Sequence, residues 1–506
     1  MRPIKFDFNN MFSFSVAKHG ASVVDLKSIM SCARGAHKHL RKCLESETDR
    51  INLGLEWANL PFQPKAQIDK VLALSREISR YENVLFLGIG GSFLGLKAAQ
   101  DALCTPYYNE FVGLRNKLPK IYFDGNNLDP QTLSTLLNNL NPRKTFVVVI
   151  SKSGETTETK AAFIVAQQWL KKSVGETYGR QIVAITDPKS GSLRKQAEEE
   201  QAKDRLSFRS LALLKGVGGR FSEFNMGLLH LSLIGVDIKQ ILSGAADMYE
   251  RCSNPDILKN PAYLYAILQN ILYRKKGKCV SILMPFSEGL KSTADWYCQL
   301  LGESIGKKYG RKIIPGPAGQ EQWVMDAARK VNVGITPVSC RGTNDLHSIQ
   351  QNNIEGENDK AITFIRVEKF ADDIKLPQDC GIISGKTYSG LLKLAQEATE
   401  WALVREDRPN CTIIMPEVSA YYWGALLFFF EMAIAFEGEL LNINAFDQPG
   451  VEGYKNYMYV KLDKPGIAPE IKKEINARPL LKKARFSFCD YGRTSGGFPF
   501  FRQYIR

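Results

Sequence analysis

The sequence lacks several patterns that would assign its class at once. Its ten cysteines include no Cys-x-x-Cys pair, which fits the reduced thiols of a cytoplasmic protein better than a disulfide framework. The first ten residues carry charges and no apolar run before a cleavage site, so we expect no secretory signal. The best candidate for a membrane span, residues 421–436, contains Glu431 and is shorter than the roughly 20 residues that a bilayer requires. We therefore expect a core helix there and no membrane association.

Motifs for nucleic-acid binding are also missing. The chain has 67 lysines and arginines against 53 acidic residues, and the net charge of +14 attracts anionic ligands of any kind, phosphorylated metabolites and nucleic acid included. The basic residues are dispersed, however, with neither an aromatic and glycine RNA motif nor a zinc finger. We expect no nucleic-acid partner. With 506 residues, 44% of them hydrophobic, the chain is long enough for two or three α/β domains.

Histidine is scarce, with five in the chain, and two of them fall in one group of possible metal ligands: Cys32, His37, His39 and Cys43. On a helix, Cys32, His39 and Cys43 share a face while His37 points elsewhere. A site with all four ligands would require the helix to break. We therefore expect no metal at this group.

Strand and helix patterns alternate along most of the chain. Continuous apolar runs at 84–87, 121–123, 145–150 and 181–186 are typical of parallel strands buried on both faces, and helical patterns separate them. After a helical region at 236–276, a second series of strands is expected at 279–284, 312–314, 331–336, 361–367 and 411–415. The prediction is an α/β fold with two doubly wound parallel sheets that face each other across a cleft. The expected parts are a helical N-terminal extension (1–80), a first α/β domain (81–240), a second α/β domain (241–455) and a C-terminal arm (456–506).

Two loops at strand ends carry groups suited to phosphate. Gly90-Gly91-Ser92 leads from a strand into a helix, where glycines allow close backbone approach and the helix N-terminus offers free N–H groups. A dinucleotide site is the alternative, but no acidic residue stands at clear ribose-binding spacing. The stretch from Ser151 to Thr156 places three hydroxyls and Lys152 before the next helix. A plain N-cap with a solvated lysine is the alternative for this second loop.

Three further stretches hold isolated groups that could act on a ligand. Arg220 follows paired glycines in Gly-Gly-Arg-Phe-Ser, which allows a fixed charge to approach a ligand closely, although a surface arginine is commoner. Glu303 lies among apolar and small residues on an expected helix, an environment that brings a carboxyl toward basicity near neutral pH. His347 follows a Gly-Thr-Asn turn. In isolation, a helical glutamate or a lone histidine is more often structural.

The apolar helix is followed by a polar turn. Gly438 is expected to end the helix, and Gln448 and Lys455 flank the bend made by Pro449-Gly450. From Gly438 to Lys455 the pattern Gly-x-Leu-Leu, four residues, Phe-Asp-Gln-x-Gly-Val-Glu, two residues, Lys matches the C-terminal motif of the glucose-6-phosphate isomerase family at each specified position. The chain resembles that family, and the Gly-Gly-Arg-Phe-Ser core and the stretches at Glu303 and His347 resemble its other motifs in the same order.

The resemblance implies two sugar isomerase (SIS) domains and the reversible isomerisation of glucose 6-phosphate and fructose 6-phosphate through a cis-enediolate, with no cofactor and no metal. In the family, residues matching Glu303, His347, Lys455 and Arg220 act as base, ring-opening groups and charge stabiliser. The histidine reaches the partner's site, so a homodimer is expected. The substrate-binding residues that the resemblance implies are Gly91, Ser92, Ser151, Lys152, Ser153, Thr156, Gln299 and Gln448.

The sequence also departs from the family pattern at several positions. Gly154-Glu155 and Asp345-Leu346 replace common family residues, and Glu223 follows the Arg220 motif where an apolar or small residue is usual. Three other classes stay open. A non-catalytic sugar-phosphate sensor would need only the phosphate loops, an NAD-linked dehydrogenase would use the glycine turn after Leu87, and a nucleic-acid binder would show strongly salt-dependent association.

Overall fold

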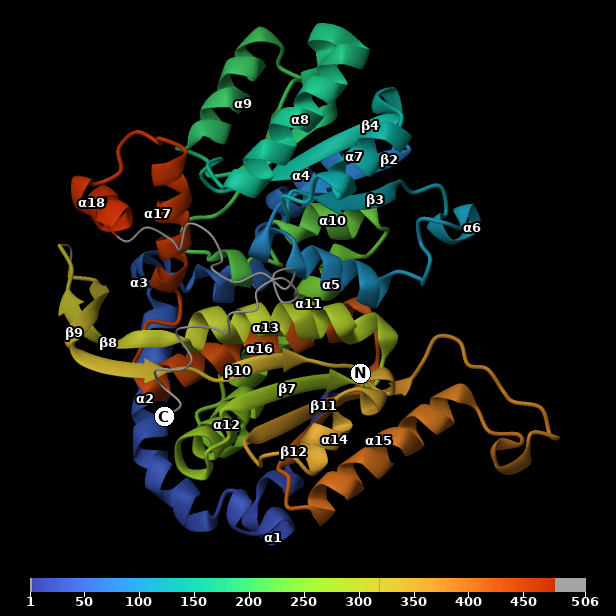
Figure 1. Cartoon of the computed structure of the whole chain (residues 1–506), viewed down its shortest axis with the longest axis vertical. Coiled ribbons are helices and arrows are strands. Elements are labelled where there is room, and N and C mark those ends of the chain that lie inside the picture. The colour runs from blue at the N-terminus through green and yellow to red at the C-terminus, as the bar shows by residue number, and fades with distance from the viewer. Residues whose placement is uncertain (1, 318, 478–506) are drawn as a thin grey trace, which may run out of the picture. The chain divides into compact units, whose positions relative to one another are not determined.

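The computed structural model describes residues 2–317 and 319–477, which fall into two compact units that meet in sequence at Asp447 and Gln448. The first unit contains two five-stranded sheets and a two-stranded hairpin (Figure 1). The second unit begins with a short 3₁₀ turn, η12 (Pro449–Val451), and continues with α17 (Glu452–Lys461) and α18 (Pro469–Ala477). Residues 478–506, most of the predicted C-terminal arm, lie outside the described part of the chain.

The first sheet is parallel throughout and confirms the first predicted strand series. Its centre is formed by strands whose residues are all buried, because helices cover both faces. The strand order is β3 (Lys120–Asp124), β2 (Asn83–Leu87), β4 (Thr145–Ile150), β5 (Ile182–Thr186) and β6 (Arg209–Ala212). Its helices are α4 (Lys65–Ile78), α5 (Leu94–Leu103), α6 (Val112–Arg115), α7 (Pro130–Asn139), α8 (Thr157–Val174), α9 (Ser192–Lys203) and α10 (Gly227–Leu233). The strand β6, which is short and half-buried, was not predicted.

The second sheet is parallel except at one edge. Its order is β1 (Lys5–Asp7), β12 (Asn410–Glu417), β11 (Lys360–Lys369), β7 (Val280–Pro285) and β10 (Thr336–Ser339), and β1 pairs antiparallel with β12. The predicted N-terminal extension is therefore not purely helical, because β1 completes this sheet. The extension also contributes α1 (Ser13–Val16), α2 (Val23–Glu45) and α3 (Glu47–Leu53). The remaining helices of the first unit are α11 (Ile238–Cys252), α12 (Pro261–Lys276), α13 (Lys291–Ile305), α14 (Gln350–Ile354), α15 (Tyr388–Arg405) and α16 (Ala420–Leu441).

Two predicted strands of the second series were placed wrongly. The stretch 312–314 belongs to β8 (Lys307–Pro315), which pairs antiparallel with β9 (Glu321–Val333) in a separate hairpin. The stretch 331–336 is divided between the end of β9 and the start of β10. Gly334 lies at this break, where a Cβ would lie 3.1 Å from the Cα of Gly306. The chain therefore changes sheets within a stretch that was predicted to be one strand.

The apolar helix is α16, and it runs through the middle of the core as expected. All of its residues from Tyr422 to Glu439 are buried. Gly438 does not end it, contrary to the prediction. The helix ends at Leu441, and Asn442 adopts the left-handed conformation (φ 51°, ψ 54°) that caps it. Gly438 instead allows close packing, since a Cβ there would lie 2.7 Å from the Cβ of Ala445.

The helix α13 lies between the two halves of the first unit. It contacts α5 on the side of the first sheet and β10 and β7 on the side of the second, with α16 beside it (Figure 1). Among the described residues, no helix is both long and apolar enough to cross a membrane. The proposed boundary between two SIS domains at residue 240 stays a prediction.

Candidate active site

The carboxylate of Glu303 lies in the last turn of α13 and is held at both oxygens. Arg220 donates from Nη1 to Oε2 at 3.1 Å, and Gln299, one turn earlier on the helix, donates from Nε2 to Oε1 at 3.0 Å. The side chain stays 31% exposed. The apolar surroundings expected for Glu303 are wrong, because its nearest partners are a guanidinium and an amide. An oriented carboxylate that is open to solvent can accept a proton from a ligand.

Arg220 lies in a short 3₁₀ turn, η7 (Gly219–Phe221), and is 2% exposed. Besides Glu303, it donates from Nε to Ser304 Oγ at 2.8 Å and from Nη2 to the carbonyl oxygens of Ala445 (2.6 Å) and Asp447 (3.1 Å). Burial lowers the pKa of the guanidinium, and the charges of Glu303 and Asp447 oppose that shift. An arginine remains protonated in such a setting. Arg220 therefore supplies a fixed positive charge and ties α13 to the turn after α16.

A second buried cation, Lys307, stands beside this pair and was not among the predicted site residues. Its ammonium donates to the carbonyl oxygens of Glu303 at 2.6 Å and Asp447 at 2.7 Å. Burial, together with the charge of Arg220, lowers the pKa of Lys307 to about 8, while Asp447 acts in the opposite direction. The sequence signal was the Gly306-Lys307 pair that follows Glu303. Its buried position and partners could not be read from that pair.

The glycine loop after β2 lies directly against the Glu303 cluster, by which we mean Glu303, Arg220, Gln299 and Lys307. Gly90 has φ +59°, and a Cβ there would lie 3.0 Å from Nε2 of Gln299. Gly91 packs against η7 so closely that a Cβ would lie 2.2 Å from the carbonyl carbon of Gly219. Ser92 ends the same 3₁₀ turn, η4 (Gly90–Ser92). The structure thus brings the predicted residues Gly91, Ser92, Arg220, Gln299 and Glu303 into one neighbourhood.

The second phosphate-type loop leaves the neighbouring strand β4 at the same edge of the first sheet, since β2 and β4 are parallel and paired. Ser151 Oγ accepts from the backbone N–H of Gly154 at 3.0 Å, and Ser153 Oγ accepts from that of Glu155 at 3.1 Å. Thr156 is the N-cap of α8, but its side chain makes no capping hydrogen bond. The plain N-cap alternative is therefore weakened. Both serines keep their hydroxyl protons, which they could donate to a ligand.

His347 lies far from Glu303 within one chain. Its turn, η10 (Asn344–His347), follows β10, and the preceding Gly342 packs on Phe286, beyond the carboxyl end of β7 and before the start of α13. Gly302, next to Glu303, approaches Pro337 at the opposite end of β10. The 15-residue α13 separates the two ends and is about 22 Å long at 1.5 Å per residue. His347 instead lines a cavity of about 720 Å³ with residues that include Phe370, Tyr388 and Leu392.

Gln448 and Lys455 belong to the second unit, so they are described apart from Glu303. Lys455 lies on α17 and pairs with Glu452 at 3.0 Å. Burial acts to lower the pKa of the Lys455 ammonium, but the hydrogen bond and charge of Glu452 outweigh it and raise the pKa above its ordinary value. The ammonium is therefore charged near neutral pH.

The group Cys32, His37, His39 and Cys43 does not converge. α2 is continuous from Val23 to Glu45, so Cys32 stands about two turns from His39 and is exposed. His37 packs against the ring of Tyr263. His39 and Cys43 do lie together, and their partner from elsewhere in the chain is Glu321.

Comparison with known proteins gives a consistent result. The family model described as phosphoglucose isomerase matches residues 75–323 and 347–468, which contain each predicted site residue. The glucose-6-phosphate isomerase of Carboxydothermus hydrogenoformans is 38% identical over 472 residues, covering 92% of this chain and 96% of that protein. The glucose-6-phosphate isomerase of Acetivibrio thermocellus is 33% identical over 483 residues, covering 94% and 99%.

Solved structures agree on the fold. A protein of Thermus thermophilus described as hypothetical superposes with a TM-score of 0.76 at 32% identity, covering 91% of this chain and all of that one (100%). A glucose-6-phosphate isomerase of Chlamydia trachomatis gives a TM-score of 0.66 at 23% identity, covering 84% and 81%. Because the family model matches most of this chain and the relatives exceed 30% identity, the chain belongs to the phosphoglucose isomerase family.

Proposed function

We propose that this chain interconverts glucose 6-phosphate and fructose 6-phosphate with Glu303 as the proton-transfer base and Arg220 as the fixed charge beside it. The reaction is that of the family, and it serves glycolysis and gluconeogenesis. The observation that carries the assignment of residues is the Glu303 carboxylate, gripped by Arg220 and Gln299 and still 31% exposed. The free cysteine thiols fit a cytoplasmic location.

The sugar phosphate is anchored at the edge of the first sheet. The serine hydroxyls of the 151–156 loop, the ammonium of Lys152 and Thr156 at the N-terminus of α8 offer donors and positive charge to a phosphate. Gly91 and Ser92 follow the neighbouring strand β2, and Gly91 packs against the turn that carries Arg220. An anchored phosphate fixes which carbons of the open-chain sugar lie at the carboxylate, so it supports proton transfer by positioning.

Proton transfer then requires a base and a stabiliser of negative charge. Glu303 takes the proton from carbon 2 of the aldose, and electrons move to the carbonyl oxygen to give a cis-enediolate. The proton of the hydroxyl on carbon 2 moves to the oxygen on carbon 1, and the protonated Glu303 returns its own proton to carbon 1, which leaves a carbonyl at carbon 2 and completes the ketose. Arg220 is already charged and fixed by its hydrogen bonds to Glu303, Ser304 and the 445–447 turn, so it stabilises the enediolate oxygen without reorganisation.

Gln299 is suited to hold a sugar hydroxyl. Its Nε2 is occupied by Glu303, while its Oε1 is buried and has no hydrogen-bond partner among the described residues. A buried acceptor without a partner is costly unless a ligand supplies a donor. A substrate hydroxyl would supply it.

Ring opening is assigned to His347 with Lys455, and Gln448 to substrate contact, as the family motif implies. Because His347 lies at the far end of α13 from Glu303 in its own chain, we infer a homodimer in which the histidine serves the partner's site. No step calls for a metal, since Arg220 carries the charge.

The test is Glu303→Gln, which keeps the shape of the side chain and removes the base. A positioned base contributes about 10²–10⁴-fold, so turnover should fall by at least about 100-fold while affinity for a competitive sugar-phosphate inhibitor is retained. The matched control is Glu176→Gln, whose side chain is 84% exposed and which should leave turnover unchanged. Turnover of Glu303→Gln within tenfold of the wild type would overturn the assignment. A sensor without catalysis would show no isomerase activity even in the wild type.

A further inference from the structure

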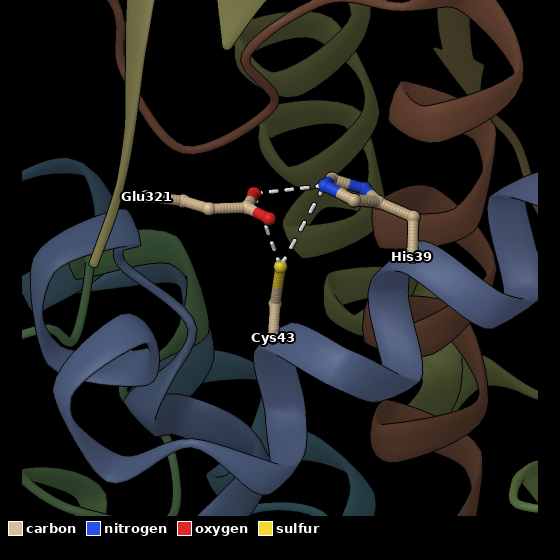
Figure 2. Close-up of side chains that lie close together, drawn as sticks. All are labelled: His39, Cys43 and Glu321. Atoms are coloured by element: carbon tan, nitrogen blue, oxygen red, sulfur yellow. Dashed lines mark hydrogen bonds and ion pairs between the residues drawn. The ribbon is translucent and has the colours of Figure 1, made fainter. Parts of the chain in front are cut away.

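Three donor atoms of different chemistry meet at one point outside the Glu303 cluster (Figure 2). His39 Nε2 lies 2.9 Å from Glu321 Oε2 and 3.8 Å from Cys43 Sγ, and Cys43 Sγ lies 3.6 Å from the same oxygen of Glu321. Imidazole, thiolate and carboxylate are the ligand types that zinc takes in proteins. We propose that His39, Cys43 and Glu321 bind a zinc ion that fastens α2 to the start of β9.

The elements present these atoms without distortion. His39 and Cys43 are one turn apart on α2, so the same helical face carries both. Glu321 is the first residue of β9, and its backbone N–H donates to Asp49 Oδ1 at 2.9 Å, which fixes the strand start against α3. Residues 32–43 do not supply four ligands by themselves, because α2 is continuous through them. The third donor comes from a hairpin 278 residues beyond Cys43 in the chain.

The spacing fits an ion of this size. Zinc binds imidazole nitrogen and carboxylate oxygen at about 2.0–2.2 Å and thiolate at about 2.3 Å, so tetrahedral ligand atoms stand roughly 3–4 Å apart. The three observed separations, 2.9, 3.6 and 3.8 Å, agree with this range apart from a small shortfall in the first, which is a hydrogen bond when no ion intervenes. Three protein ligands leave a fourth position for water.

The groups around the three ligands are those that support a metal site. His39 Nδ1 is 2.7 Å from Glu439 Oε2, the arrangement in which a carboxylate orients a ligating histidine. Glu321 uses its other oxygen, Oε1, to accept from Lys42 at 2.7 Å, so Oε2 remains directed at His39 and Cys43. Trp323 Nε1 also approaches Oε2, at 3.4 Å. The ligand orientation is therefore set before an ion enters.

The exposure and the charge of the cluster both allow a zinc ion to replace protons there. Cys43 is fully buried, but the side chains of His39 and Glu321 are 21% and 14% exposed, so an ion can enter from their side. Without an ion, Cys43, Glu439 and Glu321 raise the pKa of His39 to about 10 against the effect of burial, and burial raises the pKa of the Cys43 thiol. A zinc ion would displace one proton from each, so two positive charges replace two and the net charge of the cluster is unchanged.

An ion-pair network alone would not account for the position of the Cys43 thiol in this cluster. His39 bridging Glu321 and Glu439 needs only its two ring nitrogens. A buried thiol is a weak donor and gains little beside an imidazolium. As a thiolate, Cys43 becomes the strongest zinc ligand of the three. Substitution of Cys43 is therefore the main test of the site.

The test uses the full chain, stripped with a chelator and dialysed. Wild-type protein should bind one zinc ion per chain in competition with a chromophoric chelator, with release of protons. Cobalt(II) should give the near-ultraviolet absorption of a thiolate bound to cobalt. Loss of a group that merely orients a ligand costs about 10–100-fold in affinity, so Cys43→Ser should weaken zinc binding by about 100-fold or more and abolish the cobalt band. The matched control, Cys32→Ser, changes an exposed cysteine of the same helix and should change neither.

Isomerase activity of each variant reports whether the chain has folded, since none of the three residues belongs to the proposed catalytic set. If Cys43→Ser is inactive, Glu321→Gln takes its place, and weaker zinc binding with the cobalt band preserved is expected. Zinc binding by the wild type no tighter than by Cys43→Ser or Glu321→Gln would overturn the proposal, and the cluster would then be an ion-pair network. Because isomerisation is assayed separately, failure of the zinc site leaves the proposed function intact.

Discussion

In both five-stranded sheets, polar loops follow the carboxyl ends of the parallel strands, but the loops of the two sheets lie next to different parts of the chain. At the first sheet, the glycine loop after β2 touches Gln299 and η7, so that edge meets the Glu303 cluster of the same chain. At the second sheet, the turn with His347 lies beyond β10, at the far end of α13. One chain therefore presents the phosphate loops and the base in one place and the histidine in another. Similar sheets do not imply one shared cleft within a chain.

Mixing two inactive variants tests whether the base and the histidine of one site come from different chains. Glu303→Gln and His347→Ala should each lose about 10²–10⁴-fold in turnover, as expected for loss of a proton-transfer group. After unfolding and refolding together, half of a twofold-symmetric population is mixed, and one of its two sites keeps both groups, so activity should recover to about a quarter of wild type. Assays before and after mixing measure this. No recovery, with mixed dimers verified by tagged chains, would place the histidine and the base in the same chain.

The Glu303 end of α13 can be probed through its charge. Arg220→Lys keeps a positive charge but loses the planar donor array that binds Glu303, Ser304 and the 445–447 turn. Loss of one preorganised donor costs about 10²–10³-fold in kcat, and a drop of that size is expected with little change in KM. Arg115→Lys, at a buried arginine outside the site, is the control and should stay within about tenfold. Equal losses in both variants would indicate a structural role for Arg220.

The edge of the first sheet should respond differently, because it binds phosphate and does no chemistry. Lys152→Ala should raise KM by about 10–100-fold, the equivalent of one charge-assisted hydrogen bond, with kcat nearly unchanged. Lys189→Ala removes an exposed lysine from the loop after the adjacent strand β5 and should leave KM unchanged. Steady-state kinetics in both directions measure the effect. A fall in kcat with constant KM would move Lys152 from phosphate binding to the transition state.

The smallest effect is expected for Lys307. Since burial lowers its pKa to about 8, the ammonium is charged below that pH and loses its proton as pH rises through it. Its bonds to the carbonyl oxygens of Glu303 and Asp447 weaken with that loss, so kcat should decline by severalfold above about pH 8. Arginine stays protonated, so Lys307→Arg should move this decline to higher pH. The kcat profiles of the two proteins from about pH 6 to 10 provide the comparison, and coincident alkaline limbs would show that Lys307 does not set them.

Much of the architecture was predictable because the first sheet is buried on both faces. Runs such as Val84–Leu87 and Phe146–Ile150 are apolar at each position, which identifies a parallel strand. The hairpin of β8 and β9 was missed because its exposed and half-buried residues are mixed along both strands. Gly438 misled the prediction for α16, since a glycine placed for close contact with Ala445 has the same letter as one that ends a helix.

The site was predictable as a set of residues but not as an arrangement. The sequence motifs pointed to Arg220, Gln299 and Glu303, and these do lie together. That Arg220 also donates to the carbonyl oxygens of Ala445 and Asp447 could not be inferred, because backbone acceptors leave no trace in side-chain identity. The same holds for Glu321, whose meeting with His39 depends on how a distant hairpin folds back.

The contact between Gly91 and Gly219 couples the movement of the glycine loop to that of η7. The two backbones are in contact with no side chain between them. A shift of the glycine loop must therefore displace the turn that carries Arg220. Binding of a phosphate at the edge of the first sheet would then change the position of the Arg220 guanidinium before any proton is transferred.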